Sequence, residues 1–251
     1  MTGSAEARRR LAEVVREFRE GLESDFEAGV AWIPWEESRP PVHATPVHPT
    51  PVHATPAPSR PAPGRAAKER ALAAVAAEVA GCTLCKLCKG RTNTVPGEGN
   101  PDAEVMFVGE GPGEQEDLSG RPFVGRAGQL LRRMITEELG LDPMEVFIAN
   151  IVKRRPPGNR APEADEAAAC IPFLRRQVAA VRPRIIVTLG NPSTQSLLQT
   201  KEGITKLHGR PVVRGGFTFF PTFHPSYLLR NPPAEPDGRA DFRAVRALLG
   251  G

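Results

Sequence analysis

The stretch Glu104-Val-Met-Phe-Val-Gly-Glu-Gly-Pro-Gly113 carries the first indication of the fold. Residues 104–108 are a short apolar run that predicts a buried β-strand, and Gly109 ends it. Glycines at alternate positions then allow the backbone to turn sharply and to approach a neighbouring group closely. A buried strand that runs into a tight turn before a helix predicts an α/β protein.

The alternation of strands and helices continues along the chain. Further apolar runs predict strands at residues 146–149, 184–189 and 217–223. The expected helices cover residues 66–80, 126–139, 162–181, 191–198 and 241–249, with Asn191 as an N-cap and Pro172 as a point of bending. Strands this apolar indicate a parallel sheet that is covered on both faces. We therefore expect a three-layer α/β/α sandwich around a central four-stranded parallel sheet.

The composition before residue 66 is different. Apolar residues recur at helical spacing near the N-terminus, whereas residues 34–63 contain ten prolines in thirty positions and repeat Pro-Val-His three times. An extended five-residue period does not bring the three histidines onto one metal ion. We expect an amphipathic helix in residues 1–33, a disordered proline-rich linker in residues 34–65 and a folded domain in residues 66–251.

The overall composition excludes some classes of protein. The 251 residues are 40% hydrophobic and 25% charged, and no apolar run approaches the length of a transmembrane helix. The N-terminus lacks the apolar core of a signal peptide, so we expect a cytoplasmic protein with no membrane partner. The net charge of +4 is a mild attraction for anionic partners.

Polar side chains follow two of the expected strands. In an open parallel sheet, ligands bind beyond the carboxyl ends of the strands. Asn150 follows the second expected strand and His224 the fourth, and both would face the loop 109–117 across one rim. The loop alone is weak support for nucleotide binding, because a tight turn also explains its glycines and no P-loop lysine follows it.

The four cysteines suggest a metal site. Cys82, Cys85 and Cys88 are spaced C-x2-C-x2-C, and Cys170 lies far along the chain. Three clustered cysteines and one distant cysteine favour a single four-ligand site, holding either an iron–sulfur cluster or zinc. Such a site would pin the segment before the first strand onto the helix that carries Cys170.

Several motifs occur together in one order along residues 70–250. They are Cys82-x2-Cys85, VPGEGN at 95–100, GEGPGEQED at 109–117, GRPFVG at 120–125, NIVK at 150–153, RPPGN at 155–159 and HPSYLLR at 224–230. In these motifs the chain resembles the family 4 uracil-DNA glycosylases, the iron–sulfur type of bacteria and archaea. Residues 1–65 have no counterpart in the family pattern.

The resemblance implies a DNA repair enzyme. Such an enzyme flips deoxyuridine out of uracil-containing DNA and hydrolyses the N-glycosidic bond, which leaves an abasic site. By resemblance, His224 would stabilise the departing uracil anion through O2, Asn150 would read the uracil edge, and Phe123 would stack on the base. We expect the protein to be a monomer, with its N-terminal extension available to a further partner.

The resemblance leaves the water-activating group open. Glu110 and Gly111 would form the pocket floor, and Glu110 and Glu116 rank equally as the catalytic carboxylate, with Asp117 nearby. A binding protein that recognises the lesion but turns over poorly is the alternative to an enzyme. An iron–sulfur electron carrier is less favoured, because a carrier needs no such pocket.

The segment 224–230 would contact DNA. By resemblance it enters the duplex, with Ser226 in the motif and either Tyr227 or Leu228 filling the gap that the flipped base leaves. Phosphate contacts are expected from the basic residues Arg230, Lys153, Arg154 and Arg155.

One position departs from the family pattern. The resemblance implies a structural [4Fe–4S] cluster held by Cys82, Cys85, Cys170 and a fourth cysteine at the position of Arg154. Arginine stays protonated and cannot ligate iron. Either Cys88 supplies the fourth bond, or the cluster is incomplete, labile or lost.

Overall fold

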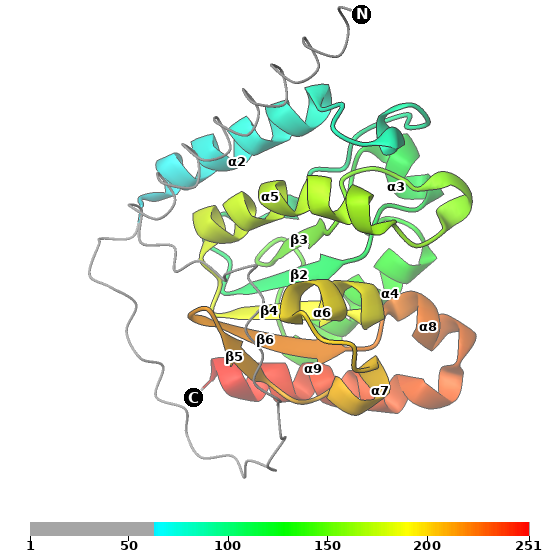
Figure 1. Ribbon diagram of the computed structural model, residues 1–251. Coiled ribbons are helices and arrows are strands. Elements are labelled where there is room, and N and C mark those ends of the chain that lie inside the picture. The colour runs from blue at the N-terminus through cyan, green and yellow to red at the C-terminus, as the bar shows by residue number, and fades with distance from the viewer. Residues whose placement is uncertain (1–62, 251) are drawn as a thin grey trace, which may run out of the picture. The chain divides into compact units, whose positions relative to one another are not determined.

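The computed structural model describes residues 63–250, which are arranged around one β-sheet (Figure 1). The sheet has six strands in the order β1-β3-β2-β4-β6-β5. Its four central strands run parallel, as predicted, and are β3 (Phe147–Asn150), β2 (Val105–Gly109), β4 (Ile185–Leu189) and β6 (Phe217–Thr222).

Two short edge strands were not expected. β1 (Glu98–Gly99) pairs antiparallel with β3, and β5 (Val212–Arg214) pairs antiparallel with β6. Strands of two and three residues are too short to show the alternation that marks a half-buried strand in sequence.

Helices cover both faces of the sheet and make the predicted three layers (Figure 1). One layer contains α4 (Arg126–Met134), its π-helical continuation η2 (Ile135–Leu139) and α9 (Glu235–Leu249). The other contains α5 (Ala164–Val181) and α6 (Gly190–Leu198), and α2 (Arg65–Gly81) packs on α5. The remaining short helices are η1 (Lys86–Cys88), α3 (Glu114–Ser119), η3 (Pro157–Asn159), α7 (Ile204–Leu207), α8 (Pro225–Arg230) and η4 (Pro232–Ala234).

Strand β2 shows how one sequence serves both cores. Val105 and Phe107 pack in the layer with α4 and α9, whereas Met106 and Val108 pack in the layer with α5 and α6. Successive side chains of a strand point to opposite faces, so a strand buried on both sides has to be apolar throughout. This explains why β2 is a continuous apolar run.

Two expectations about helices need correction. Asn191 lies inside α6 and does not cap it, because its side-chain oxygen accepts a hydrogen bond from the Ile204 amide at 2.6 Å. Helix α9 begins at Glu235 rather than Asp241, since proline is tolerated in a first helical turn. Helix α5 continues through Pro172 as one element, as expected, and a bend at Pro172 stays a prediction.

The predicted N-terminal helix (1–33) and almost all of the predicted linker (34–65) lie outside the described residues. Within residues 63–250, none of the helices combines the length and apolar character needed to cross a bilayer.

Candidate active site

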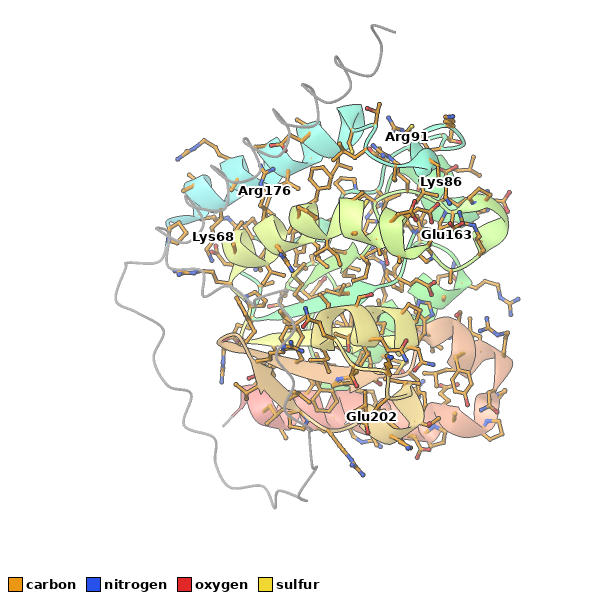
Figure 2. The ribbon with its side chains drawn as sticks, viewed as in Figure 1. Lys68, Lys86, Arg91, Glu163, Arg176 and Glu202 are labelled. Atoms are coloured by element: carbon orange, nitrogen blue, oxygen red, sulfur yellow. The ribbon has the colours of Figure 1, made fainter. Side chains whose placement is uncertain are left out.

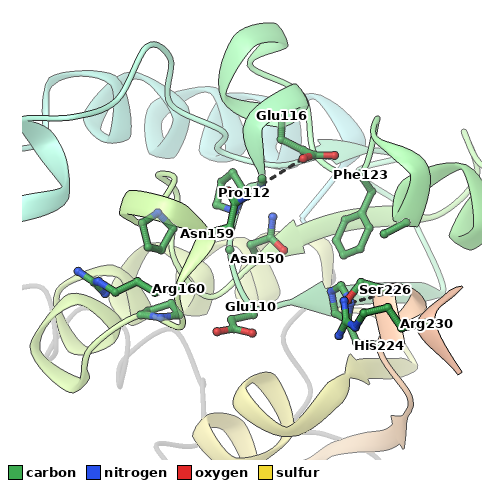
Figure 3. A pocket seen from close by; sticks show the side chains of 15 residues that line it. Glu110, Pro112, Glu116, Phe123, Asn150, Asn159, Arg160, His224, Ser226 and Arg230 are labelled. Carbon is green, nitrogen blue, oxygen red and sulfur yellow. Dashed lines mark hydrogen bonds between the residues drawn. The ribbon is translucent and has the colours of Figure 1, made fainter. Parts of the chain in front are cut away.

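The carboxyl ends of β2, β3 and β6 lead into the walls of one cavity of about 330 Å³ (Figure 3). Parallel pairing places Gly109 opposite Asn150, and β6 continues through Phe223 to His224. This volume lies in the range of ~300–1,000 Å³ that is usual for small-molecule sites. The predicted residues that line it are Glu110, Gly111, Glu116, Phe123, Asn150, His224, Ser226 and Arg230.

Gly109 makes room for two of these side chains. A Cβ atom at this position would lie 2.4 Å from Asn150 Oδ1 and 2.6 Å from the tip of the Phe123 ring. Both distances are shorter than van der Waals contact, so any larger residue would push the amide and the ring out of place. Glycine at position 109 therefore lets the Asn150 amide and the Phe123 ring lie close to the backbone at the cavity wall.

Asn150 lines the cavity and has a side-chain amide oxygen that accepts no hydrogen bond from the described residues. The side chain is 2% exposed, and Oδ1 has no hydrogen-bond partner among the described residues. A buried unpaired acceptor costs about 1–3 kcal/mol, which a ligand donor would recover. The residue is thus arranged to bind a group that carries a hydrogen-bond donor.

His224 is held as a neutral hydrogen-bond donor. It caps α8, and its Nδ1 accepts from the Ser226 amide at 3.1 Å. Since Nδ1 is the acceptor, the ring proton resides on Nε2. Burial, and to a smaller extent the positive charge of Arg230, lower the pKa of His224 to about 4. The imidazole is therefore uncharged at neutral pH.

Phe123 is fixed in an unusual backbone conformation. Its φ of 52° lies in the left-handed region, which is uncommon for a bulky residue. Its ring lies with its centroid 5.8 Å from that of His224. Gly128 permits the conformation, because a Cβ there would lie 1.9 Å from the Phe123 carbonyl oxygen.

Glu116 supports the same loop rather than reaching freely into the cavity. One of its carboxylate oxygens accepts from the amides of Val124 and Gly125, both at 2.8 Å, and the other accepts from Gly113 at 3.1 Å. These bonds tie the two residues after Phe123 to the start of α3. Asp117 is likewise committed, since it is buried and accepts from the Thr92 and Asn93 amides.

Glu110 is the carboxylate that remains free. It lines the cavity and makes no side-chain hydrogen bond among the described residues (Figure 3). Burial raises the pKa of this carboxyl group above its ordinary value. A partly desolvated carboxylate with unoccupied lone pairs can accept a proton or hold a water molecule.

Helix α8 distinguishes the two side chains that were expected to fill the gap left by a flipped base. Leu228 is 1% exposed and belongs to the core, so its burial argues against a role in filling that gap. Tyr227 is 37% exposed and stacks on Phe223 with centroids 5.4 Å apart. Arg230 is exposed and lines the cavity mouth.

Comparison with known proteins extends these observations. Residues 96–249 match the family model described as the uracil DNA glycosylase superfamily, which is more than half of the chain. The chain belongs to the uracil-DNA glycosylase superfamily. It is 50% identical over 186 residues to a protein named type-4 uracil-DNA glycosylase from Saccharolobus solfataricus, covering 71% of this chain and 86% of the relative. A protein of the same name from Thermotoga maritima is 49% identical over 166 residues, covering 65% of this chain and 86% of that relative.

For this member of the superfamily, two expected phosphate contacts are wrong. Lys153 and Arg154 are each 1% exposed, because the chain after β3 turns into the layer that contains α5. Burial lowers the pKa of Lys153 to about 7. Arg155 is partly exposed and donates to Asn159 Oδ1 at 2.8 Å, so among the three it alone remains near solvent.

Arg154 lies beside the cysteine-bearing segment. Its Nη2 donates to the carbonyl oxygens of Val79, at 3.0 Å, and of Cys82. Its Nε and Nη1 have no hydrogen-bond partner in the described part of the chain. The guanidinium group therefore links the end of α2 to the turn after β3.

The cysteines do not form an evident metal site. Cys170 is buried in the core, Cys85 packs against the same core, and Cys82 and Cys88 are half-buried. Within residues 63–250, no group of three or more histidine, cysteine or acidic side chains is placed to hold a metal ion. Protein contacts hold this segment: Lys86 pairs with Glu163, and Arg91 donates to the carbonyls of Ala80 and Cys82 (Figure 2).

Sequence reasoning missed one wall of the cavity. Asn159 and Arg160 line the side opposite His224 (Figure 3), and Pro156 and Pro162 also line the cavity. Arg160 makes two hydrogen bonds, of 2.8 and 2.7 Å, to the buried carboxylate of Glu166. The motif at 155–159 pointed to this loop, but nothing in it indicated that the loop closes the pocket.

Proposed function

We propose that this protein removes uracil from DNA by hydrolysing the bond between uracil N1 and the deoxyribose C1′. The observation that carries the proposal is the cavity in which the unpaired Asn150 oxygen, the neutral His224 ring and the fixed Phe123 ring meet. Family membership and relatives named type-4 uracil-DNA glycosylase support the same activity.

The amide of Asn150 suits the edge of uracil. Its oxygen would accept from uracil N3–H, and its nitrogen would donate to O4. Cytosine offers no proton at N3 and an amino donor in place of O4, so both pairings would fail. A site that leaves its own buried polar groups unpaired rejects the wrong base strongly.

His224 would stabilise the leaving group. As the N1–C1′ bond breaks, its electron pair moves onto uracil and negative charge develops at O2. A neutral imidazole whose Nδ1 is already occupied can donate Nε2–H to that oxygen, and it is pre-aligned by the Ser226 amide. Phe123 would stack on the flipped base and fix its plane.

We assign activation of the attacking water molecule to Glu110. The sugar gains positive charge in the transition state, and a water molecule attacks C1′ as the bond to uracil breaks. Glu110 would orient this water and accept its proton, because its carboxylate is free whereas that of Glu116 is bonded to three amides. Glu116 then acts as a positioning residue for the Phe123 loop.

DNA binding would use helix α8 and the cavity mouth. Tyr227 is the exposed aromatic that could fill the gap in the duplex, and Arg230 is placed for a phosphate. Extrusion of a base costs a few kcal/mol, which contacts to the pocket and the filling side chain would offset.

The residues present do not fit a complete four-thiolate cluster. Arg154 holds a buried positive charge beside the cysteines, and the described side chains do not converge on a metal. We propose that the [4Fe–4S] cluster expected from the resemblance is incomplete or absent here, and no chemical step depends on it.

The test measures product as well as binding. The purified chain is incubated with an oligonucleotide that contains one deoxyuridine, and free uracil and abasic sites are quantified. The proposal expects both products in equal amounts. Tight and selective binding without release would favour a lesion-binding protein instead.

A further inference from the structure

Lys153 is a buried lysine that the proposed reaction does not use directly. It follows Asn150 by three residues and is among the largest side chains with less than 2% exposure. Because it reaches neither solvent nor the cavity lining, it cannot be a phosphate contact in this conformation. The side chain nevertheless ends in a buried amino group beside Asn150, the residue proposed to read the base.

The amino group of Lys153 makes two directed hydrogen bonds. Lys153 Nζ donates to the main-chain oxygen of Asn150 at 2.8 Å and to Gln177 Oε1 at 2.6 Å. Gln177 in turn donates from Nε2 to the Pro96 carbonyl at 2.7 Å. The lysine thus joins the end of β3 to helix α5 and to the segment that leads into β1.

The bond to Asn150 fixes the peptide at the end of the strand. The chain is held on the other side by the amide of Ile151, which donates to the Gly109 carbonyl at 2.9 Å. Without Lys153, the Asn150 carbonyl would lose its buried donor, and an unpaired buried carbonyl favours rotation of the peptide toward another partner. Rotation of this peptide would redirect the Asn150 side chain.

We propose that Lys153 is a positioning residue that, together with Gln177, orients the Asn150 amide for recognition of uracil. This inference rests on the proposed function. It predicts that Lys153 affects excision only through Asn150. A displacement of about 1 Å at a reacting geometry can lower a rate by about 10²-fold, so the effect should be large.

The test is a double-mutant cycle on single-turnover uracil release. Lys153→Met removes the donor with little change of volume, and we expect a rate at least about tenfold lower than that of the wild type. In the Asn150→Ala background the same change should alter the rate by less than about twofold, because the coupling partner is gone. Lys206→Met, on the exposed surface of α7, is the matched control and should change neither rate.

Binding measurements distinguish positioning from contact with DNA. The affinity for uncleaved DNA and its dependence on salt should be the same in Lys153→Met and wild type, since a lost phosphate contact would reduce the salt slope. Equal losses of rate in both backgrounds, or a reduced salt slope, would overturn the inference.

A second variant covers the case in which Lys153→Met does not fold. Gln177→Met leaves the lysine in place but removes its second acceptor, and it should lower the rate at least threefold in the wild-type background and leave it unchanged in Asn150→Ala. If the wild type releases no uracil, the proposed function fails. If the wild type is active and both variants keep its rate, only the role of Lys153 fails.

Discussion

His224 illustrates how a few contacts set the chemistry of one residue. The Ser226 amide occupies Nδ1, and burial keeps the ring neutral. In the proposed reaction, the neutral imidazole would donate Nε2–H to the developing anion, so His224 would not have to bind a proton before the bond breaks. The same residue in an exposed loop would be partly charged near neutral pH.

We predict that His224→Ala lowers uracil release at least about tenfold. Loss of one preorganised donor to a developing oxyanion typically costs about 2.7–4 kcal/mol. The measurement is the single-turnover rate on a uracil oligonucleotide, with the folded state checked by thermal unfolding. A rate within threefold of the wild type would remove His224 from the mechanism.

Glu110 should set the acid limb of the pH–rate profile. A carboxylate base is active above its pKa, and burial raises the pKa of Glu110, so activity should fall as the pH drops toward that raised value. His224, with a pKa of about 4, stays neutral over this range. We expect Glu110→Gln to release uracil slowly and to lose the fall in rate at acid pH.

Glu116→Gln is the matched control for this profile. It should keep the acid limb but unfold at a lower temperature, because its carboxylate holds three amides of the Phe123 loop. If the fall in rate at acid pH persists in Glu110→Gln and vanishes in Glu116→Gln, Glu116 is the base and Glu110 is not.

At the scale of the element, helix α8 determines which of two candidate DNA-contacting side chains is exposed. Its six residues turn Leu228 into the core and leave Tyr227 exposed. We predict that Tyr227→Ala lowers excision more on double-stranded than on single-stranded DNA, because only the duplex has a gap to fill.

Leu228→Ala should instead destabilise the fold by about 2–5 kcal/mol, as expected for a buried leucine. Equal effects of Tyr227→Ala on both substrates would exclude the filling role. The comparison uses single-turnover rates on matched oligonucleotides and denaturant unfolding of both variants.

The segment with Cys82, Cys85 and Cys88 is a second element whose behaviour can be measured. We predict that the wild type carries fewer than the four irons of a complete cluster, and that Arg154→Cys holds more iron and sulfide than Arg154→Ser. Both variants remove the link to Val79, so their difference isolates the new thiol. A full complement of iron in the wild type that is lost in Cys88→Ser would make Cys88 the fourth ligand.

Much of the fold was visible in the sequence because its signals are local. Apolar runs marked the four parallel strands, and the polar residues that follow them, Asn150 and His224, marked the rim. The burial of Lys153 and Arg154 was not visible, since a basic pair after a strand ordinarily faces solvent. The burial of Leu228 was not predicted either, because the segment 224–230 has too few residues to show a helical period.

At the scale of the whole molecule, the sheet brings together segments that are far apart in sequence. The loop after β2, the turn after β3 and the start of α8 meet only because β2, β3 and β6 are parallel and end at one rim. The side chains that line the cavity therefore stand on a sheet that has a hydrophobic core on each face. The central claim is that this rim reads and releases uracil.

The most direct test compares base release from two oligonucleotides that differ only by uracil or cytosine at one position. The wild type should release uracil and leave cytosine in place. Asn150→Asp should release uracil at least about tenfold more slowly, because a carboxylate offers no donor to O4 and leaves that oxygen unpaired. An Asn150→Asp protein that keeps the wild-type rate and selectivity would contradict the account.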